Sequence, residues 1–220
     1  VLFRSDLSED FDTDRPGAKL SSLWVIRDGK ATRMHIARDP DYRVTDPNYP
    51  MEHWHTWDAF DGSRTSGFLI DDRWKGKGDD FFRGATIWTQ HRGLMGSPHR
   101  VSVRDYQPSR GGFKIRSPGG ARYRWHRTRR GLFRYRRQIH YFIENVPDFL
   151  DAPHEHYYAG AGPEKGRLYV RLPDGVNPND VIFEAGTIRS PIEIRDADHI
   201  EISGLSFSFN DEDDGLYGYP

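Results

Sequence analysis

Short alternations of apolar and polar residues run along most of the chain. Leu23-Trp24-Val25-Ile26 and Met34-His35-Ile36-Ala37-Arg38 lie on either side of an Asp28-Gly29 pair. Asp-Gly favours the left-handed backbone of a two-residue hairpin turn, and alternation with period two is typical of a half-buried strand. Residues 23–38 are therefore predicted to form a β-hairpin.

Gly and Pro separate three further apolar runs, which predict strands. The runs are Phe68-Leu69-Ile70, Gly84-Ala85-Thr86-Ile87-Trp88 and Arg100-Val101-Ser102-Val103. Residues 40–66 have little periodicity and predict a long loop. Pro147-Asp148-Phe149-Leu150-Asp151 predicts one helical turn.

The pattern changes after Pro191, where apolar residues recur at every second position and Asp196-Ala197-Asp198 and Ser203-Gly204 interrupt them. Two short strands with a tight Gly corner are what one coil of a β-solenoid requires. The residues predicted to face inward are Ile192, Ile194, Ile200, Ile202, Leu205, Phe207 and Phe209. A single coil cannot bury its own inner face, so this end is expected to be an unprotected edge.

Composition supports a folded, strand-rich protein. Charged residues make up 30% of the chain, but aromatic residues reach 14%, which is not a disordered composition. The net charge of −1 argues against a general nucleic-acid or membrane-surface binder. No apolar run approaches the roughly 18 residues of a membrane span. The absence of Cys excludes disulfides and Cys-ligated metals.

Residues 141–175 contain an aromatic strand, an acidic Pro turn and a strand ending in Leu-Pro-Asp-Gly, and the short alternations after residue 191 follow them. This order resembles the segment that precedes the helix in bacterial right-handed parallel β-helix glycoside hydrolases of the xylosidase, xylanase and fucosidase type. In those proteins ENxPxxLDAPGEWYYD and LYxxPPDG segments lead into a strand that reads IxIxGLxF. The resemblance covers residues 20–209 and is strongest from Tyr141 onward.

The resemblance implies an all-β chain, with a β-sandwich-like insert domain that leads into the first coil of a right-handed parallel β-helix. Residues 1–19 are expected to be an acidic, ragged N-terminus that begins with an adapter-encoded Val1-Leu2-Phe3-Arg4-Ser5, residues 20–189 the insert, and residues 190–220 the truncated start of the helix.

The function implied is that of a fragment of a secreted, polysaccharide-degrading glycoside hydrolase. Such hydrolysis needs two carboxylates. In the resembling proteins these lie on later coils, so no catalytic residue is assigned in this chain. The alternative is a non-catalytic carbohydrate-binding or adhesin protein on the same scaffold. A polysaccharide lyase and a nucleic-acid binder rank below both.

Two segments are candidates for substrate contact. An acidic loop follows the last predicted strand, where its carboxylates can hold Ca²⁺ or line a glycan groove, although a solvated turn is the ordinary alternative. Its residues are Asn210, Asp211, Glu212, Asp213 and Asp214. No other cofactor is expected.

The second segment, residues 122–137, interleaves eight Arg with aromatic residues. Arg124 and Trp125 are its candidate ligand contacts, because Arg pairs with carboxylate or sulfate and Trp stacks on sugars. A solvated hairpin face and a nucleic-acid surface remain alternatives. Trp54, Trp57, Trp74 and Trp88 are further candidates for sugar stacking, although burial in a sheet is the commoner use.

The chain has two His-x-His pairs, His53 with His55 and His154 with His156. On a strand each pair places two imidazoles on one face, where they can contribute to a Zn site. No third ligand at fixed spacing supports such a site.

In the resembling proteins Gly stands at position 154, which implies a positive φ there, and a Glu matches Glu155. Asp151 and Glu155 are expected to cap backbone N–H groups at the start of the strand.

Overall fold

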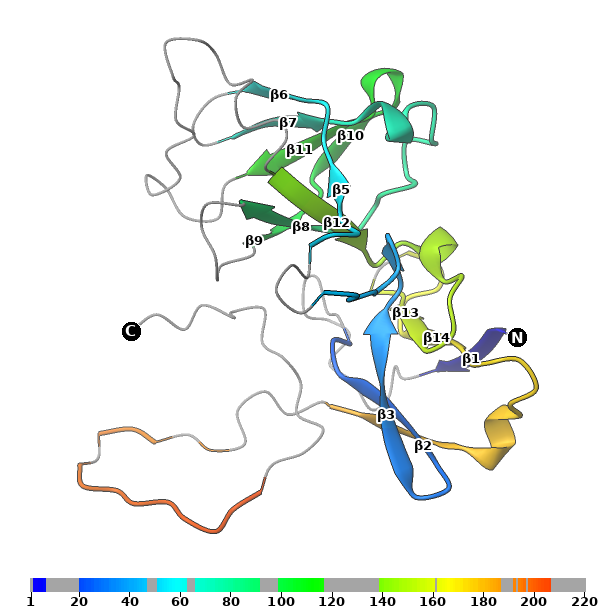
Figure 1. Cartoon of the computed structure of the whole chain (residues 1–220), viewed down its shortest axis with the longest axis vertical. Coiled ribbons are helices and arrows are strands. Elements are labelled where there is room, and N and C mark those ends of the chain that lie inside the picture. Colours follow the sequence, from blue (N-terminus) through cyan, green and yellow to red (C-terminus); the bar gives the residue numbers. More distant parts are fainter. Residues whose placement is uncertain are drawn as a thin grey trace. The chain divides into compact units, whose positions relative to one another are not determined.

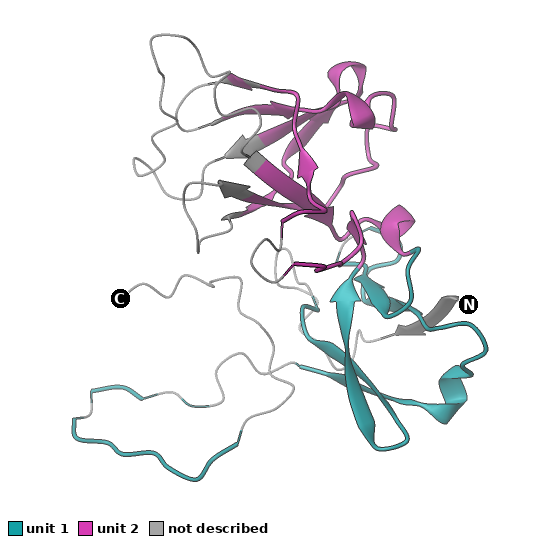
Figure 2. Cartoon of the chain, viewed as in Figure 1, with its two compact units in different colours: residues 1–36, 151–220 teal, residues 37–150 magenta. Residues whose placement is uncertain are grey.

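The structure is a computed structural model of the 220-residue chain. It describes residues 2–6, 20–46, 51–62, 66–91, 99–116, 139–160, 162–186, 192, 194–196 and 198–206. All regular structure in this part is β-strand or 3₁₀ turn, as predicted (Figure 1). The chain forms two compact units: unit 1 comprises residues 1–36 and 151–220, and unit 2 residues 37–150 (Figure 2). The predicted domain limits at residues 19 and 189 stay predictions.

Unit 1 contains one six-stranded sheet with the order β1-β14-β13-β3-β2-β15. Its pairs are antiparallel except for β13 and β3, which run parallel. The strands are β1 (Leu2–Asp6), β2 (Leu23–Arg27), β3 (Lys30–Ile36), β13 (Glu155–Tyr158), β14 (Arg167–Arg171) and β15 (Ile182–Ala185), and the 3₁₀ turn η5 (Pro178–Asp180) precedes β15.

The predicted hairpin is confirmed as β2 and β3. Asp28 and Gly29 form its turn with φ of 51° and 73°, the left-handed values that two-residue hairpins need. Burial alternates along β2, so Leu23 and Val25 face the core while Trp24 is half-buried on the other face. The core of unit 1 consists of Leu20, Leu23, Val25, Met34, Tyr158, Leu168, Val170 and Leu172.

Unit 2 contains two sheets, β10-β11-β7-β6 and β4-β12-β8-β9, and β5 also pairs with β12. The strands are β4 (Arg38–Asp39), β5 (His55–Thr56), β6 (Ala59–Gly62), β7 (Ser66–Ile70), β8 (Thr86–His91), β9 (His99–Ser102), β10 (Asp105–Gln107), β11 (Gly112–Arg116) and β12 (Ile139–Glu144). The 3₁₀ turns are η1 (Asp72–Trp74), η2 (Pro108–Arg110) and η4 (Pro147–Phe149).

The three strands predicted between residues 68 and 103 are confirmed as β7, β8 and β9, and the helical turn predicted at residues 147–151 is confirmed as η4. The loop predicted over residues 40–66 is wrong in part, because β5 and β6 lie within it. Their partners are β12 and β7. Pairing with strands elsewhere in the chain, and not a local alternation, defines these two short strands.

Aromatic side chains fill the core of unit 2. Trp74 lies at its centre, with ring contacts to Phe82 at 5.4 Å, Phe149 at 5.7 Å and Phe113 at 6.5 Å. Its indole Nε1 donates to the Tyr141 hydroxyl at 2.9 Å. Buried indole N–H groups require such a partner, so this bond helps to fix how Trp74 packs.

The predicted β-helix coil is not shown. Among the described residues after Gly186 there is no strand. The side chains predicted to face inward are instead exposed, from 38% at Ile192 to 60% at Leu205. One coil offers no second layer to cover its apolar face, so these side chains have nothing to pack against. Phe207 and Phe209 lie outside the described residues.

No helix in the described part of the chain has the length and hydropathy of a membrane span.

Candidate functional site

The two faces of strand β12 carry different chemistry. Tyr141 and Ile143 are fully buried in the core of unit 2. Successive side chains of a strand point to opposite faces, so Phe142 and Glu144 lie on the other face of the same sheet. In Figure 1, β12 lies between β5 and β8, its partners in the sheet.

The register of the sheet brings further side chains to that face. Phe142 lies opposite Trp88 of β8, and Trp88 lies opposite Arg100 of β9. Glu144 lies opposite Arg38 of β4. Together with Trp54, which precedes β5 and contacts Phe142, these residues form the cluster that we call the Phe142 face: Arg38, Trp54, Trp88, Arg100, Phe142 and Glu144.

Rings and a guanidinium group pack closely on the Phe142 face. The ring centroids of Trp54 and Phe142 are 4.6 Å apart at 80°, and those of Trp88 and Phe142 are 5.9 Å apart at 15°. The Arg38 Cζ lies 3.5 Å from the Phe142 centroid, a cation–π contact. Tyr42, 54% exposed, has its ring 5.8 Å from the same Cζ. Trp54 and Trp88 stay half-buried, so their rings are only partly covered.

A buried ion pair lies beside these rings. The Arg100 Nε is 3.5 Å from Glu144 Oε1, and the two side chains are 14% and 9% exposed. The Arg100 Cζ also lies 5.7 Å from the Trp88 ring centroid. Glu144 Oε1 and Trp88 Nε1 are buried and have no hydrogen-bond partner among the described residues. An unmet buried donor or acceptor is costly, and for Glu144 Oε1 the charge of Arg100 offsets part of this cost.

This arrangement suits binding better than hydrolysis. Partly exposed rings can pack against the apolar face of a ligand. A glycosidase needs two carboxylates, and Glu144 is the one carboxylate among the six residues of the cluster.

The structure divides the candidate tryptophans into two kinds. Trp57 and Trp74 are core residues, 4% and 3% exposed, whereas Trp54 and Trp88 lie on the Phe142 face. Of the other candidates, Arg124, Trp125, Asn210, Asp211, Glu212, Asp213 and Asp214 lie outside the described residues.

The histidines of each His-x-His pair have separate surroundings. The His53 Nε2 lies 2.9 Å from the Thr45 hydroxyl, while His55 pairs with Asp39. His156 is fully buried in unit 1, and its Nε2 lies 2.8 Å from the carbonyl oxygen of Leu20. Because that oxygen is an acceptor, the proton is on Nε2. Burial above all lowers the pKa of His156 to about 4.

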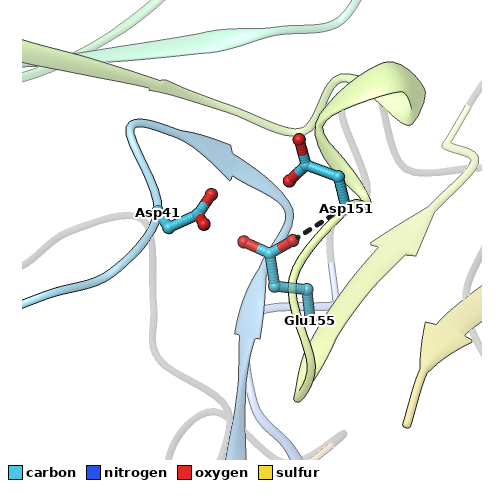
Figure 3. Close-up of side chains that lie close together, drawn as sticks. All are labelled: Asp41, Asp151 and Glu155. Atoms are coloured by element: carbon cyan, nitrogen blue, oxygen red, sulfur yellow. Dashed lines mark hydrogen bonds between the residues drawn. The ribbon is translucent and has the colours of Figure 1, made fainter. Parts of the chain in front are cut away.

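The predicted capping role is confirmed for Glu155. Its Oε2 accepts from the backbone N–H of Asp151 at 3.2 Å and of Ala152 at 3.1 Å, and the first of these bonds is visible in Figure 3. The positive φ at position 154 is also confirmed, with His154 at 66°. Glu155 thus holds the turn before β13. Figure 3 also draws Asp41, which belongs to unit 2.

Four residues of the Phe142 face were not predicted from the sequence: Arg38, Arg100, Phe142 and Glu144. One signal was present, since Phe142 and Glu144 are two positions apart in a predicted strand and so share a face. Their partners come from β4 and β9, and only the register of the sheet brings these together.

Comparison with known proteins identifies a similar fold but assigns the chain to no family. No family model matches the chain, and no curated protein matches it. A solved structure named "Glycoside hydrolase" matches 86% of this chain with a TM-score of 0.53 and 17% sequence identity. This chain covers 29% of the length of that structure. The likeness shows an all-β fold similar to part of a glycoside hydrolase.

Proposed function

We propose that this chain is the carbohydrate-binding part of a secreted, polysaccharide-degrading glycoside hydrolase, and that unit 2 binds the glycan on the Phe142 face. The observation that carries the proposal is the combination on one sheet face of half-buried Trp54 and Trp88 with a buried Glu144. The likeness of the fold to a part of a glycoside hydrolase also supports a carbohydrate ligand.

Sugars have the chemistry that this face complements. A pyranose ring has C–H groups on its flat side, which pack on an aromatic ring, and hydroxyl groups at its rim, which both donate and accept hydrogen bonds. The usual pattern of small-ligand sites is similar: mostly apolar and aromatic walls with a few well-placed polar groups. Trp54 and Trp88 would supply the aromatic wall.

In this proposal the catalytic carboxylates belong to coils of a right-handed parallel β-helix that residues 190–220 begin. The acidic residues from Asn210 to Asp214, with Arg124 and Trp125, would add contacts to the polysaccharide. The experiment for this part is to recover the complete gene by sequencing outward from both ends. Coils that carry paired Asp or Glu residues would support it, and their absence from the complete gene would contradict it.

The binding claim is tested by screening the chain against immobilised neutral and acidic plant and microbial polysaccharides. For any glycan that binds, Trp88→Ala and Trp54→Ala should each weaken affinity by about tenfold, the loss expected for one aromatic contact. Trp24→Ala is the matched control, because Trp24 is a half-buried Trp of unit 1. Equal losses in all three variants would contradict binding on the Phe142 face.

A non-catalytic carbohydrate-binding or adhesin protein is the second candidate. The observation that favours it is the single carboxylate on the Phe142 face, where hydrolysis requires two. Incubating the complete gene product with a glycan that it binds separates the two candidates, since a hydrolase releases reducing ends and an adhesin does not.

A further inference from the structure

Tyr42 lies beside the Phe142 face, and we propose that it is a further stacking platform, so that the site binds neighbouring units of a glycan chain and not a single sugar. This inference rests on the proposed function, because it extends the same site. It adds a residue that contacts the ligand and a requirement for a chain.

The Tyr42 side chain is open to solvent. Among the described side chains of unit 2, the large apolar ones that are exposed are Tyr42, at 54%, and Val44, at 42%. Single exposed apolar side chains are ordinary, so exposure alone does not mark a site. The second observation is the position of the Tyr42 ring, next to rings that belong to the Phe142 face.

The guanidinium group of Arg38 joins the Tyr42 ring to this face. Its Cζ lies 5.8 Å from the Tyr42 ring centroid, 5.9 Å from that of Trp54 and 3.5 Å from that of Phe142. Arg38 is only 8% exposed, and its Nε donates to the Pro40 carbonyl oxygen at 2.9 Å. A buried guanidinium group held in this way is a fixed support on which rings can pack. Tyr42 and Trp54 are therefore neighbours on one support.

Side-chain contacts also hold the segment that carries Tyr42 against the segment that carries Trp54. The contacts are Asp39 with His55, and the Thr45 hydroxyl with His53 Nε2 at 2.9 Å. Along both segments these contacts lie on either side of the two rings. A site whose parts are held before the ligand arrives loses less conformational entropy on binding. The rings of Tyr42 and Trp54 are thus preorganised to receive one ligand.

Two neighbouring rings match a chain better than a single sugar. A pyranose is similar in size to one aromatic ring, so a sugar that packs on Trp54 leaves Tyr42 for the next unit of the same chain. The rival explanation is that Tyr42 only covers the cation of Arg38, which is a contact within the protein. The experiment must therefore separate contact with the ligand from support of Arg38.

The test measures how affinity depends on the length of the glycan. The whole chain is titrated in a calorimeter with the members, from monosaccharide to hexasaccharide, of a β-1,4-glucan, a β-1,4-xylan and an oligogalacturonate series. For a series that binds, affinity should rise with length. Tyr42→Ala should weaken binding of the longest member by about tenfold, the loss expected for one aromatic contact, and leave the shortest member that binds unchanged. Tyr42→Trp keeps a ring and should retain the rise.

Val44→Ala is the matched control, because Val44 is an exposed apolar residue of the same segment and has no ring. It should leave affinity unchanged at every length. Trp54→Ala should weaken binding of every member, since Trp54 belongs to the Phe142 face itself. Circular dichroism and a thermal melt establish that each variant is folded.

Each outcome decides between the claims. If Trp54→Ala and Trp88→Ala weaken binding but Tyr42→Ala has no effect, or an equal effect at every length, the proposed function stands and this inference is overturned. Equal losses in Tyr42→Ala and Val44→Ala would also overturn it, because the ring would then have no role of its own. Binding that only Tyr42→Ala weakens would overturn the proposed site and this extension of it. Binding of no member of any series, or of the wider polysaccharide screen, would overturn the proposed function and this inference with it.

Discussion

The Tyr141 hydroxyl donates a hydrogen bond of 2.5 Å to Oδ2 of Asp71 in the core of unit 2, across 70 positions of sequence. The same hydroxyl accepts from Trp74 Nε1 at 2.9 Å. Both bonds are buried, so one phenolic oxygen joins strand β12 to the start of the 3₁₀ turn η1. Burial, and then the Asp71 carboxylate, raise the pKa of Tyr141 above its ordinary value, so the hydroxyl keeps its proton.

Tyr141→Phe should therefore destabilise unit 2 by about 2–3 kcal/mol, because it removes the buried hydrogen bonds that the hydroxyl makes with Asp71 Oδ2 and Trp74 Nε1. Urea denaturation followed by Trp fluorescence measures the change. Tyr42→Phe is the control, since Tyr42 is 54% exposed, and its effect should stay within about 0.5 kcal/mol. Equal losses of unfolding free energy in the two variants would show that the two buried hydrogen bonds of Tyr141 add no stability of their own.

Gly111 lies where no larger residue fits. Its φ is 59°, and a Cβ at this position would lie 2.2 Å from the Asp71 carbonyl oxygen. Gly76 has a φ of 76° but open space around its Cβ position. Gly76→Ala should cost about 1 kcal/mol from backbone strain alone, whereas Gly111→Ala should cost about 3 kcal/mol or more, because the backbone must also move. Thermal melts of the two variants measure the difference, and similar melting temperatures would contradict the close approach.

The buried His156 should make the stability of unit 1 sensitive to acid. Its pKa falls from 6.5 in the unfolded chain to about 4 in the folded chain, so the unfolded chain binds more protons between these values. The contribution of His156 to the free energy of unfolding is therefore complete above pH 6.5. It is lost as the pH falls toward 4, by about 3 kcal/mol in all.

His156→Gln tests this, because a Gln amide can donate to the Leu20 carbonyl and does not titrate. The variant should show a flatter dependence of unfolding free energy on pH between 4 and 6.5 than the unchanged chain. His199→Asn, at an exposed position, should keep the original slope. A slope that His156→Gln leaves unchanged would assign the acid sensitivity to other groups.

The turn before β13 is strained at His154, with a φ of 66°. Gly adopts this backbone without a Cβ penalty, and Ala does not. His154→Gly should consequently be about 1 kcal/mol more stable than His154→Ala. Chemical denaturation of this pair measures the difference, and an Ala variant as stable as the Gly variant would contradict the strain.

Local chemistry made part of this structure predictable. The Asp28-Gly29 hairpin and the Glu155 cap each depend on residues within about four positions of one another, where turn geometry and side-chain reach decide the outcome. The positive φ at His154 followed from the resemblance to proteins with Gly at that position.

The Phe142 face could not be predicted in the same way. Its members come from β4, β8, β9 and β12 and from the segment before β5, so they meet only through the register of a sheet whose strands span more than a hundred positions. The coil predicted after Pro191 shows that a local pattern alone does not specify a packed structure. The alternation of Ile192, Ile194, Ile200 and Ile202 is real, but alternation alone does not supply the layer that would bury these side chains.

The central claim, that a glycan binds on the Phe142 face, is tested most directly by NMR of the indole N–H groups. Single Trp→Phe variants assign the signals, and a glycan selected by binding is then titrated into the ¹⁵N-labelled chain. If a glycan binds there, the signals of Trp54 and Trp88 shift with a common dissociation constant, while those of the core residues Trp57 and Trp74 stay fixed. Shifts confined to Trp24 of unit 1, or binding that leaves Trp54 and Trp88 unmoved, would contradict it.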